Sequence, residues 1–358
     1  MSQPGHGEGL WPLGGNNLSR QGGGEGTRLG GEDLMVLTEA VGQAQRAPSV
    51  HNTQPWRWRV RPGTVELHAD WQRHLVTTDP DRRDLVLSCG AALHHLQVAL
   101  AAQGLEAHVE RLPDPEDEGH LATVTVRPGT PDPAEAALFP AIERRRTDRR
   151  RMSHRPVPPS ELDALVEQAD RKGAELIVMT GAMRRRLTTA LTEAARRQLH
   201  TPGYVSELHM WTSRYAAARD GIPKANIAPP PAGLVEPSPL RHFPGGRLPQ
   251  PDQPPGRGPA DDGAELLVLA TAEDTLIDRI RAGEALSAVL LAATLRGLAT
   301  TPLSQALEVE QTRAAIQQDV LRTLAQPQIV VRVGWPATSA TDLPPTPRRD
   351  LRTVLLPT

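Results

Sequence analysis

Residues 47–56 (APSVHNTQPW) place hydroxyl and amide side chains between two prolines and directly before an aromatic residue. Ser49, Asn52 and Gln54 can hold a flat polar ligand by hydrogen bonds, and the prolines restrict the loop backbone around them. The segment supplies no obvious acid, base or nucleophile of its own. This pattern predicts that a bound cofactor carries the reaction and that the protein binds and orients it.

A second cluster, at residues 145–149, contains Arg145, Arg146, Thr147 and Arg149. Two guanidinium groups and a hydroxyl within five residues can bind a phosphate in a bidentate manner, which a diffuse lysine patch does less well. The alternative is a solvated helix end with mixed charges. Binding of RNA is a further alternative, but no aromatic stacking platform accompanies the run.

Hydrophobic periodicity predicts the elements that must position these two clusters. Residues 1–30 are rich in glycine and are expected to be a disordered tail. Helices are expected over residues 33–45, 82–103, 133–145, 160–172, 181–199, 276–296 and 308–325. Strands are expected over residues 56–60, 65–69, 121–126, 175–179, 265–270 and 328–333.

Two blocks of the chain, residues 90–105 and 283–298, resemble each other. In each block a glycine is followed by an alanine- and leucine-rich helical stretch, a second glycine comes 14 residues after the first, and an extended segment comes next. This repeat predicts two copies of one helix-then-strand unit packed about a pseudo-two-fold axis. Coincidence between two core helices of similar composition is the alternative.

The repeat divides the chain into an expected first half at residues 31–132 and a second half at residues 133–358. The second half carries an insertion at about residues 201–263, which includes a proline-rich run with almost no periodicity. Insertions of this length are usually functional lids or disordered segments, and a surface linker without function remains open here. Trp211 and Tyr215 are the aromatic candidates for covering a ligand.

Four motifs in order resemble the FMN-dependent nitroreductase family. Residues 145–149 (RRTDR) look like its phosphate-binding Arg-Arg-Ser-x-Arg element, and residues 47–56 look like its Ala-Pro-Ser-x-x-Asn-x-Gln-Pro-Trp loop. Residues 297–303 are similar to its Gly-Leu segment at the flavin edge, and residues 333–349 are similar to its closing strand and basic pair. The split between the halves most resembles the Acg family, in which two nitroreductase halves are fused and one FMN lies under a lid.

The resemblance implies an α+β nitroreductase-like fold, with two fused half-domains packed as an intramolecular pseudo-dimer and a lid insertion. It implies FMN as the cofactor, no metal, and no catalytic side chain in the usual sense, with the backbone N–H of Ser304 facing flavin N5. Val50 departs from the family pattern, as do Ser304 and Gln305, so hydrogen bonds there must come from the backbone. The implied cofactor-binding set is Pro48, Ser49, Asn52, Gln54, Arg145, Arg146, Thr147, Arg149, Leu303, Ser304, Arg348 and Arg349.

The function implied is hydride transfer through the flavin from NAD(P)H to a small nitroaromatic or quinone-like acceptor. The alternative is a protein that binds or sequesters FMN without turnover, with the lid closed over the flavin. The fusion implies a monomer, because one chain supplies both sides of the interface that other nitroreductases form between subunits. The residues do not decide between NADH and NADPH, nor do they identify the physiological acceptor.

Composition limits the other classes of function. The formal net charge of −2 gives no overall attraction to nucleic acid or to acidic membranes, and no apolar run is expected to cross a bilayer. The single Cys89 fits a reducing compartment, so we expect a cytoplasmic protein and a buried, inert thiol. No phosphate-binding loop or dinucleotide-binding glycine motif is present, and histidines 68, 74, 94 and 95 lack the spacing of a metal site.

Overall fold

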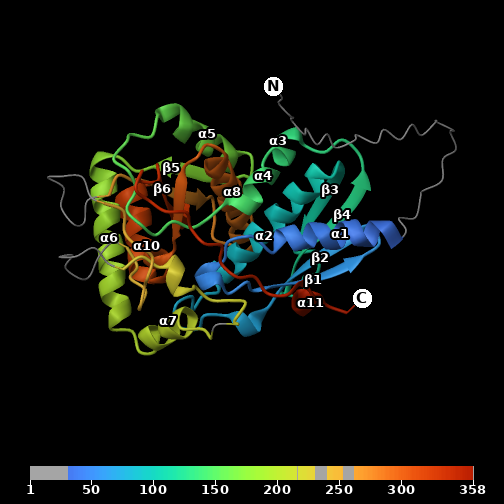
Figure 1. The fold of residues 1–358 in the computed structure, drawn as a ribbon, viewed down its shortest axis with the longest axis horizontal. Coiled ribbons are helices and arrows are strands. Elements are labelled where there is room, and N and C mark those ends of the chain that lie inside the picture. The colour runs from blue at the N-terminus through green and yellow to red at the C-terminus, as the bar shows by residue number, and fades with distance from the viewer. Residues whose placement is uncertain (1–30, 216, 230–239, 253–261, 358) are drawn as a thin grey trace, which may run out of the picture.

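The structure is a computed structural model that describes residues 31–215, 217–229, 240–252 and 262–357. The expected tail at residues 1–30 lies outside the described residues. The described chain begins with α1 (Gly31–Ala44), which packs on the first of two sheets (Figure 1).

The first sheet contains four antiparallel strands in the order β1-β2-β4-β3. Trp56 and Trp58 of its first strand are fully buried while Arg57 between them is exposed, which is the two-residue period of a half-buried strand. The strands are β1 (Trp56–Arg61), β2 (Thr64–Ala69), β3 (Leu105–Arg111) and β4 (His120–Pro128), and α2 (Arg83–Ala102) connects β2 to β3.

The second sheet repeats this arrangement with four antiparallel strands in the order β5-β6-β8-β7. Its strands are β5 (Glu175–Val178), β6 (Glu265–Thr271), β7 (Ala299–Leu303) and β8 (Gln326–Gly334), and α8 (Leu276–Leu295) connects β6 to β7. Both sheets therefore share one topology, with a long helix at the same place in each. The predicted α+β class with two related halves in one chain is confirmed, while the borders of the halves stay a prediction.

Helices α2 and α8 cross at the centre of the molecule, and each is buried along most of its length (Figure 1). Their backbones meet at the first glycine of each repeated block. A Cβ atom on Gly90 would lie 2.1 Å from the carbonyl oxygen of Ile280, and one on Gly283 would lie 2.1 Å from that of Leu87. The repeated glycines thus mark the contact that joins the two halves.

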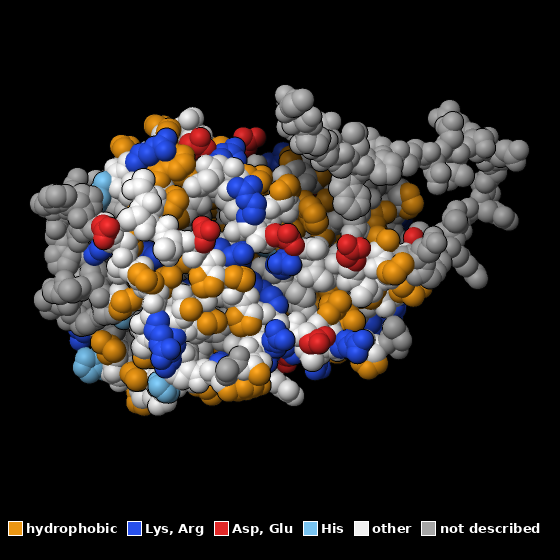
Figure 2. All heavy atoms as spheres, viewed as in Figure 1, with side chains coloured by type: hydrophobic (Ala, Val, Ile, Leu, Met, Phe, Trp, Pro, Cys, Tyr) orange, Lys and Arg blue, Asp and Glu red, His pale blue; other side chains and the backbone are white. Residues whose placement is uncertain are grey.

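Helix α2 is also long and apolar enough to cross a membrane by length and hydropathy, which the sequence analysis did not anticipate. Most of its apolar window, 89%, is buried inside the protein, as expected for a core helix. On the face seen in Figure 2, acidic and basic side chains of the described residues are interspersed with apolar ones.

Two predicted helices are interrupted. The helix expected over residues 133–145 is split into α3 (Pro133–Ala136) and α4 (Phe139–Arg144), because Pro140 has no N–H to continue the ladder and starts a new helix instead. The helix expected over residues 308–325 is split at Val309, whose backbone is extended. It comprises α9 (Gln305–Glu308), α10 (Glu310–Ala315) and a π-helical turn, Ile316–Leu321.

The remaining described helices are the 3-10 helices Val50–Asn52, Trp71–Arg73 and Lys224–Asn226, and α5 (Pro159–Asp170), α6 (Gly181–Leu199), α7 (Tyr204–Thr212) and α11 (Leu351–Val354). Of these remaining helices, only α5 and α6 were expected. Helix α11 packs beside β1, so the end of the second half lies against the first sheet (Figure 1).

The helix crossing can be tested by adding one methyl group. Gly90→Ala should lower the free energy of unfolding by about 1–3 kcal/mol or more, because the new Cβ overlaps a backbone oxygen that cannot move alone. Gly42→Ala in α1 is the matched control, because nothing lies within 4 Å of its Cβ position, and it should be neutral or slightly stabilising. Urea denaturation of both variants measures the difference, and equal effects would contradict the close crossing.

Candidate functional site

Two adjoining cavities lie where the halves meet. The larger one, about 860 Å³, is lined mainly by apolar side chains and is called the apolar cavity here. The smaller one, about 670 Å³, is lined by five arginines and is called the basic cavity. Pro48, Ser49, Thr147 and Arg149 line both, so the two cavities adjoin and form one site.

The loop at residues 47–54 reaches this site, and three of its residues have a backbone conformation that is rare for residues other than glycine. His51, Asn52 and Gln54 have φ values of 45°, 56° and 52°, in the left-handed region. Two contacts hold the turn: the Ser49 hydroxyl accepts a hydrogen bond from the Gln54 N–H at 2.9 Å, and the Asn52 amide donates to the Gly221 carbonyl at 2.9 Å. Strain maintained in this way is a frequent feature of ligand-binding loops.

The basic cavity concentrates buried positive charge. Burial first, and then repulsion from neighbouring arginines, lowers the pKa of Arg145 to about 10 and that of Arg348 to about 9. Burial and Arg241 likewise lower the pKa of Arg149 to about 10. All three stay charged at neutral pH. Among the described residues none of them forms an ion pair with a carboxylate, and Arg145 Nε has no hydrogen-bond partner.

Buried cations without counter-ions are costly, and a bound anion removes that cost. Arg348 also donates to the carbonyl oxygens of Gln45 at 2.7 Å and Arg46 at 2.9 Å, at the C-terminal end of α1. Its guanidinium is therefore fixed by the backbone before any ligand arrives. The arrangement favours a phosphate-sized anion.

The apolar cavity extends from this anion site between the two long helices. Leu87 of α2 and Leu286 of α8 both line it, and Leu303 and Ser304 line it at the end of β7. Such a slot accepts a flat apolar ring, with polar groups along one edge.

The structure brings ten of the twelve predicted cofactor-binding residues to the cavity walls. Asn52, Arg145, Arg146 and Arg348 line the basic cavity, and Leu303 and Ser304 line the apolar cavity; the four shared residues are named above.

Gln54 and Arg349 line neither cavity, and their predicted role in cofactor binding stays a prediction. The Gln54 side chain accepts a hydrogen bond from the Arg349 N–H at 2.7 Å and donates to the Arg219 carbonyl at 2.9 Å. The Arg349 guanidinium bonds to the Gln54 carbonyl at 3.1 Å and pairs with Asp70 at 3.3 Å. These side chains bond the C-terminal segment to the loop, so their polar groups already have partners within the protein.

The insertion covers the apolar cavity with residues other than those expected. Trp211 packs under Arg214, 4.3 Å from its ring centroid, and Tyr215 is 74% exposed; neither lines the cavity. The cavity is lined instead by Leu240, Arg241 and Phe243, called the lid segment here. The segment lies within the proline-rich run at residues 228–259, whose lack of periodicity gave no sequence signal for it.

Arg241 and Phe243 hold the lid segment in place through contacts with the rest of the site. Arg241 forms a buried ion pair with Glu308 and donates to His51 Nε2 at 2.6 Å. The Phe243 ring meets the His51 ring edge to face at 5.6 Å, and Arg149 lies 5.2 Å from the Phe243 centroid. Sequence reasoning missed Arg241, Glu308 and His51, because their pairing joins segments far apart in the chain.

Cys89 is fully buried in α2 and donates to the Pro55 carbonyl at 3.1 Å. Burial raises the pKa of its thiol, so no reactive thiolate forms near neutral pH. The expectation of a buried, inert cysteine is confirmed.

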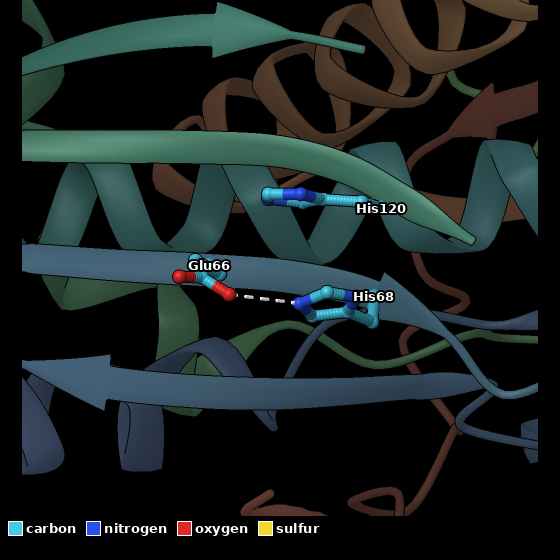
Figure 3. Close-up of side chains that lie close together, drawn as sticks. All are labelled: Glu66, His68 and His120. Carbon is cyan, nitrogen blue, oxygen red and sulfur yellow. Dashed lines mark hydrogen bonds and ion pairs between the residues drawn. The ribbon is translucent and has the colours of Figure 1, made fainter. Parts of the chain in front are cut away.

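One group of potential metal ligands lies away from the cavities, on the first sheet (Figure 3). Glu66 and His68 are 3.1 Å apart, and the His68 ring stacks on His120 at 4.5 Å. Each carboxylate oxygen of Glu66 already accepts a hydrogen bond at 2.7 Å from an arginine, Arg59 or Arg61. Two cations at that distance oppose a metal ion, and the geometry favours an ion-pair network.

No protein-family model matches the chain. The chain is 46% identical over 320 residues to the protein named "Putative NAD(P)H nitroreductase Rv3131" of Mycobacterium tuberculosis, covering 89% of this chain and 90% of that protein. It is 37% identical over 332 residues to "Putative NAD(P)H nitroreductase acg" of the same organism, covering 89% and 96%. The structure of the FMN-dependent nitroreductase NfnB from Mycobacterium smegmatis in complex with NADPH is 16% identical and covers 62% of this chain and 99% of that chain, with a TM-score of 0.37.

Two related sheets, two crossed helices and a cavity between the halves define a nitroreductase-like α+β protein with both halves in one chain. The structural likeness to NfnB is too weak to carry the assignment further. The identities and coverages of the two relatives do so: the chain belongs to the Acg family of nitroreductase-like proteins, within the FMN-dependent nitroreductase superfamily. The resemblance found in the sequence is confirmed.

The anion site can be tested with Arg145→Met, which removes a buried cation that has no carboxylate partner. Without ligand this variant should be more stable than the wild type by about 1 kcal/mol or more, because an unpaired buried charge is lost. The wild type should gain stability from added inorganic phosphate, and the variant should lose that gain. Arg171→Met, which breaks a surface ion pair with Asp132, is the control and should change neither result. A less stable Arg145→Met protein that still responds to phosphate would contradict the assignment.

Proposed function

We propose that the chain binds one FMN and acts as an NAD(P)H-dependent oxidoreductase of nitroreductase type. The observation that carries the proposal is the junction of an unpaired arginine cluster with an apolar slot, since FMN joins a phosphate to a flat ring. Bound FMN supplies two-electron chemistry, taking a hydride from NAD(P)H and reducing a nitroaromatic or quinone-like acceptor. Family membership supports the same assignment.

The residues present fit this cofactor. Arg145, Arg149 and Arg348 would hold the phosphate, with the hydroxyl of Thr147 beside them. Ser49 lies on both cavities, where the sugar-like chain of FMN would pass from phosphate to ring. A charge-assisted hydrogen bond from each guanidinium would contribute more than a neutral one.

The other end of the site would orient the ring. Leu303 ends β7, a strand of the second sheet, and Ser304 follows it, so the backbone there would be held by the sheet. The lid segment would exclude water from the ring, because Phe243 and Leu240 add apolar surface above the slot. No side chain need act as a nucleophile.

One chain would make the whole site. The loop at residues 48–52 comes from the first half, and Arg145–Arg149 and Ser304 come from the second half. We therefore infer a monomer that needs no second subunit to complete its cavity. The single buried Cys89 fits a cytoplasmic protein, which we also propose.

A second candidate is binding of FMN without turnover. The observation that favours it is the lid segment, since Arg241 is fixed to Glu308 and Phe243 closes against His51. If this cover stays closed, FMN binds but NAD(P)H cannot reach the ring. The two candidate functions differ in whether NAD(P)H can reach the flavin ring. Both use the same residues to bind FMN.

Anaerobic addition of NADPH and, separately, NADH to the yellow holoprotein tests the proposal. The oxidoreductase should lose its visible flavin absorbance with one of them, and then recover it on addition of a quinone. Protein that is bleached by dithionite and by neither nucleotide would favour sequestration, and protein that cannot bind FMN would refute both.

A pair of variants shows whether the lid segment limits that reaction. Phe243→Ala removes the ring that closes the cavity, so bleaching should become faster in this variant than in the wild type. Tyr215→Ala is the matched control from the same insertion, because its exposed side chain does not line the cavity. Equal rates in all three proteins would show that the segment does not gate access.

A further inference from the structure

The first turn of α2 brings a carboxyl group to the wall of the apolar cavity, where the proposed cofactor contacts leave it unused. Asp84 is 5% exposed and lines the cavity together with Leu87 and Ser88 of the same helix. Its Oδ2 atom is fully buried and has no hydrogen-bond partner among the described residues. A buried polar atom in this state points to a ligand atom that completes it.

The backbone of Asp84 is held from two sides. Asp79 caps the helix, accepting hydrogen bonds from the N–H of Asp84 at 3.1 Å and of Leu85 at 2.8 Å. The Ser88 hydroxyl donates to the Asp84 carbonyl at 2.5 Å and accepts from the N–H of Val50 at 3.1 Å. The second contact couples the carboxyl-bearing turn to the strained loop at the other wall.

The charges around Asp84 are mostly negative. Burial raises its pKa well above the ordinary range, and repulsion from Asp79 and Glu308 raises it further, while Ser304 and Arg241 oppose this more weakly. Burial also raises the pKa of Asp79 to about 7. Both effects, burial and repulsion, shift the carboxyl of Asp84 toward its protonated form.

Basic groups on the other walls of the apolar cavity do not offset the rise in the pKa of Asp84. Arg241 is paired with Glu308, and Arg332 is paired with Asp262. Arg149 faces the basic cavity as well as the apolar one.

His51 is a poor alternative as an acid in this cavity. Burial, Arg241 and Arg149 lower its pKa well below the ordinary value, so its ring is neutral. Its Nε2 accepts the hydrogen bond from Arg241 and carries no proton there. Asp84 is the acidic proton carrier that the described cavity wall offers.

We propose that Asp84 is the proton donor of the apolar cavity and passes the proton on its Oδ2 to an oxygen atom of the acceptor. This proposal rests on the proposed oxidoreductase function. Reduction of a quinone by NAD(P)H consumes one hydride equivalent and one proton and yields a hydroquinone and NAD(P)⁺. In the proton step the Oδ2–H bond breaks, an O–H bond forms on the acceptor, and the carboxylate regains a proton from solvent.

The test compares two acceptors, because one needs a proton and the other does not. Reduced holoprotein is mixed in a stopped-flow instrument with 1,4-benzoquinone, which takes up protons, or with ferricyanide, which takes up only electrons. Asp84→Asn should slow reoxidation by benzoquinone by about 10²–10⁴-fold, the usual contribution of a general acid, and leave ferricyanide unaffected. The wild-type rate with benzoquinone should fall as pH rises through the pKa of Asp84, and the variant should lose that dependence.

Asp81→Asn is the matched control. Its carboxylate lies three residues earlier, is about half exposed and pairs with Arg313 at 3.1 Å on the surface. Both acceptors should reoxidise this variant at the wild-type rate. Asp84→Glu, which keeps the carboxyl, should recover part of the benzoquinone rate.

A second readout needs no cofactor. A carboxyl whose folded pKa is raised contributes stability that is present below its unfolded pKa of about 4 and is lost as pH rises through the folded pKa. Urea unfolding of the FMN-free wild type should therefore show falling stability over this range, and Asp84→Asn should show a smaller fall. Asp79 still titrates in the variant, so part of the fall remains.

Each outcome decides one claim. If NAD(P)H fails to reduce the flavin, the proposed function fails, and reduction by dithionite still allows the two acceptors to be compared. If Asp84→Asn slows both acceptors equally, or neither, or leaves the pH dependence of unfolding unchanged, Asp84 is not the proton donor. A selective loss with benzoquinone together with the flatter stability profile supports it.

Discussion

The close crossing of α2 and α8 is the constraint on which the rest of the structure depends. Only glycine at positions 90 and 283 lets the two backbones approach this closely. The crossing fixes the distance between the halves beside the apolar cavity, which Leu87 of α2 and Leu286 of α8 both line. It also orients the N-terminal turn of α2, which carries Asp84, toward the end of β7.

Around that crossing, the two halves contribute different chemistry to one site. The first half supplies the strained loop and the α2 carboxyl, and the second supplies the arginines at residues 145–149 and the β7 edge. Arg348 returns from the C-terminal segment to the end of α1 and completes the cationic wall. Duplication has therefore produced an asymmetric pair, in which the fold is repeated and the binding groups are not.

Much of this could be predicted from the sequence. The core helices and most strands have clear hydrophobic periods, and the spacing of the glycines revealed the repeat. The loop at residues 47–56 and the arginine run gave seven of the ten cavity residues through their resemblance to a family, and the other motifs gave Leu303, Ser304 and Arg348. Contacts between distant segments could not be predicted from the sequence. Gln54 and Arg349 bind each other, and Arg241 reaches Glu308 from a proline-rich run without periodicity. Two expected helices are interrupted, at Pro140 and at Val309. The proline could be recognised in the sequence as a helix breaker, whereas the extended backbone of Val309 could not.

The central claim is that one chain forms one complete FMN site across its own two halves. The most direct measurement is the molar mass of the holoprotein in solution together with the number of FMN molecules released per chain. The account predicts a mass close to the 38.8 kDa of one chain and one FMN for each. Two FMN molecules per chain, or FMN bound only by a dimer, would contradict it.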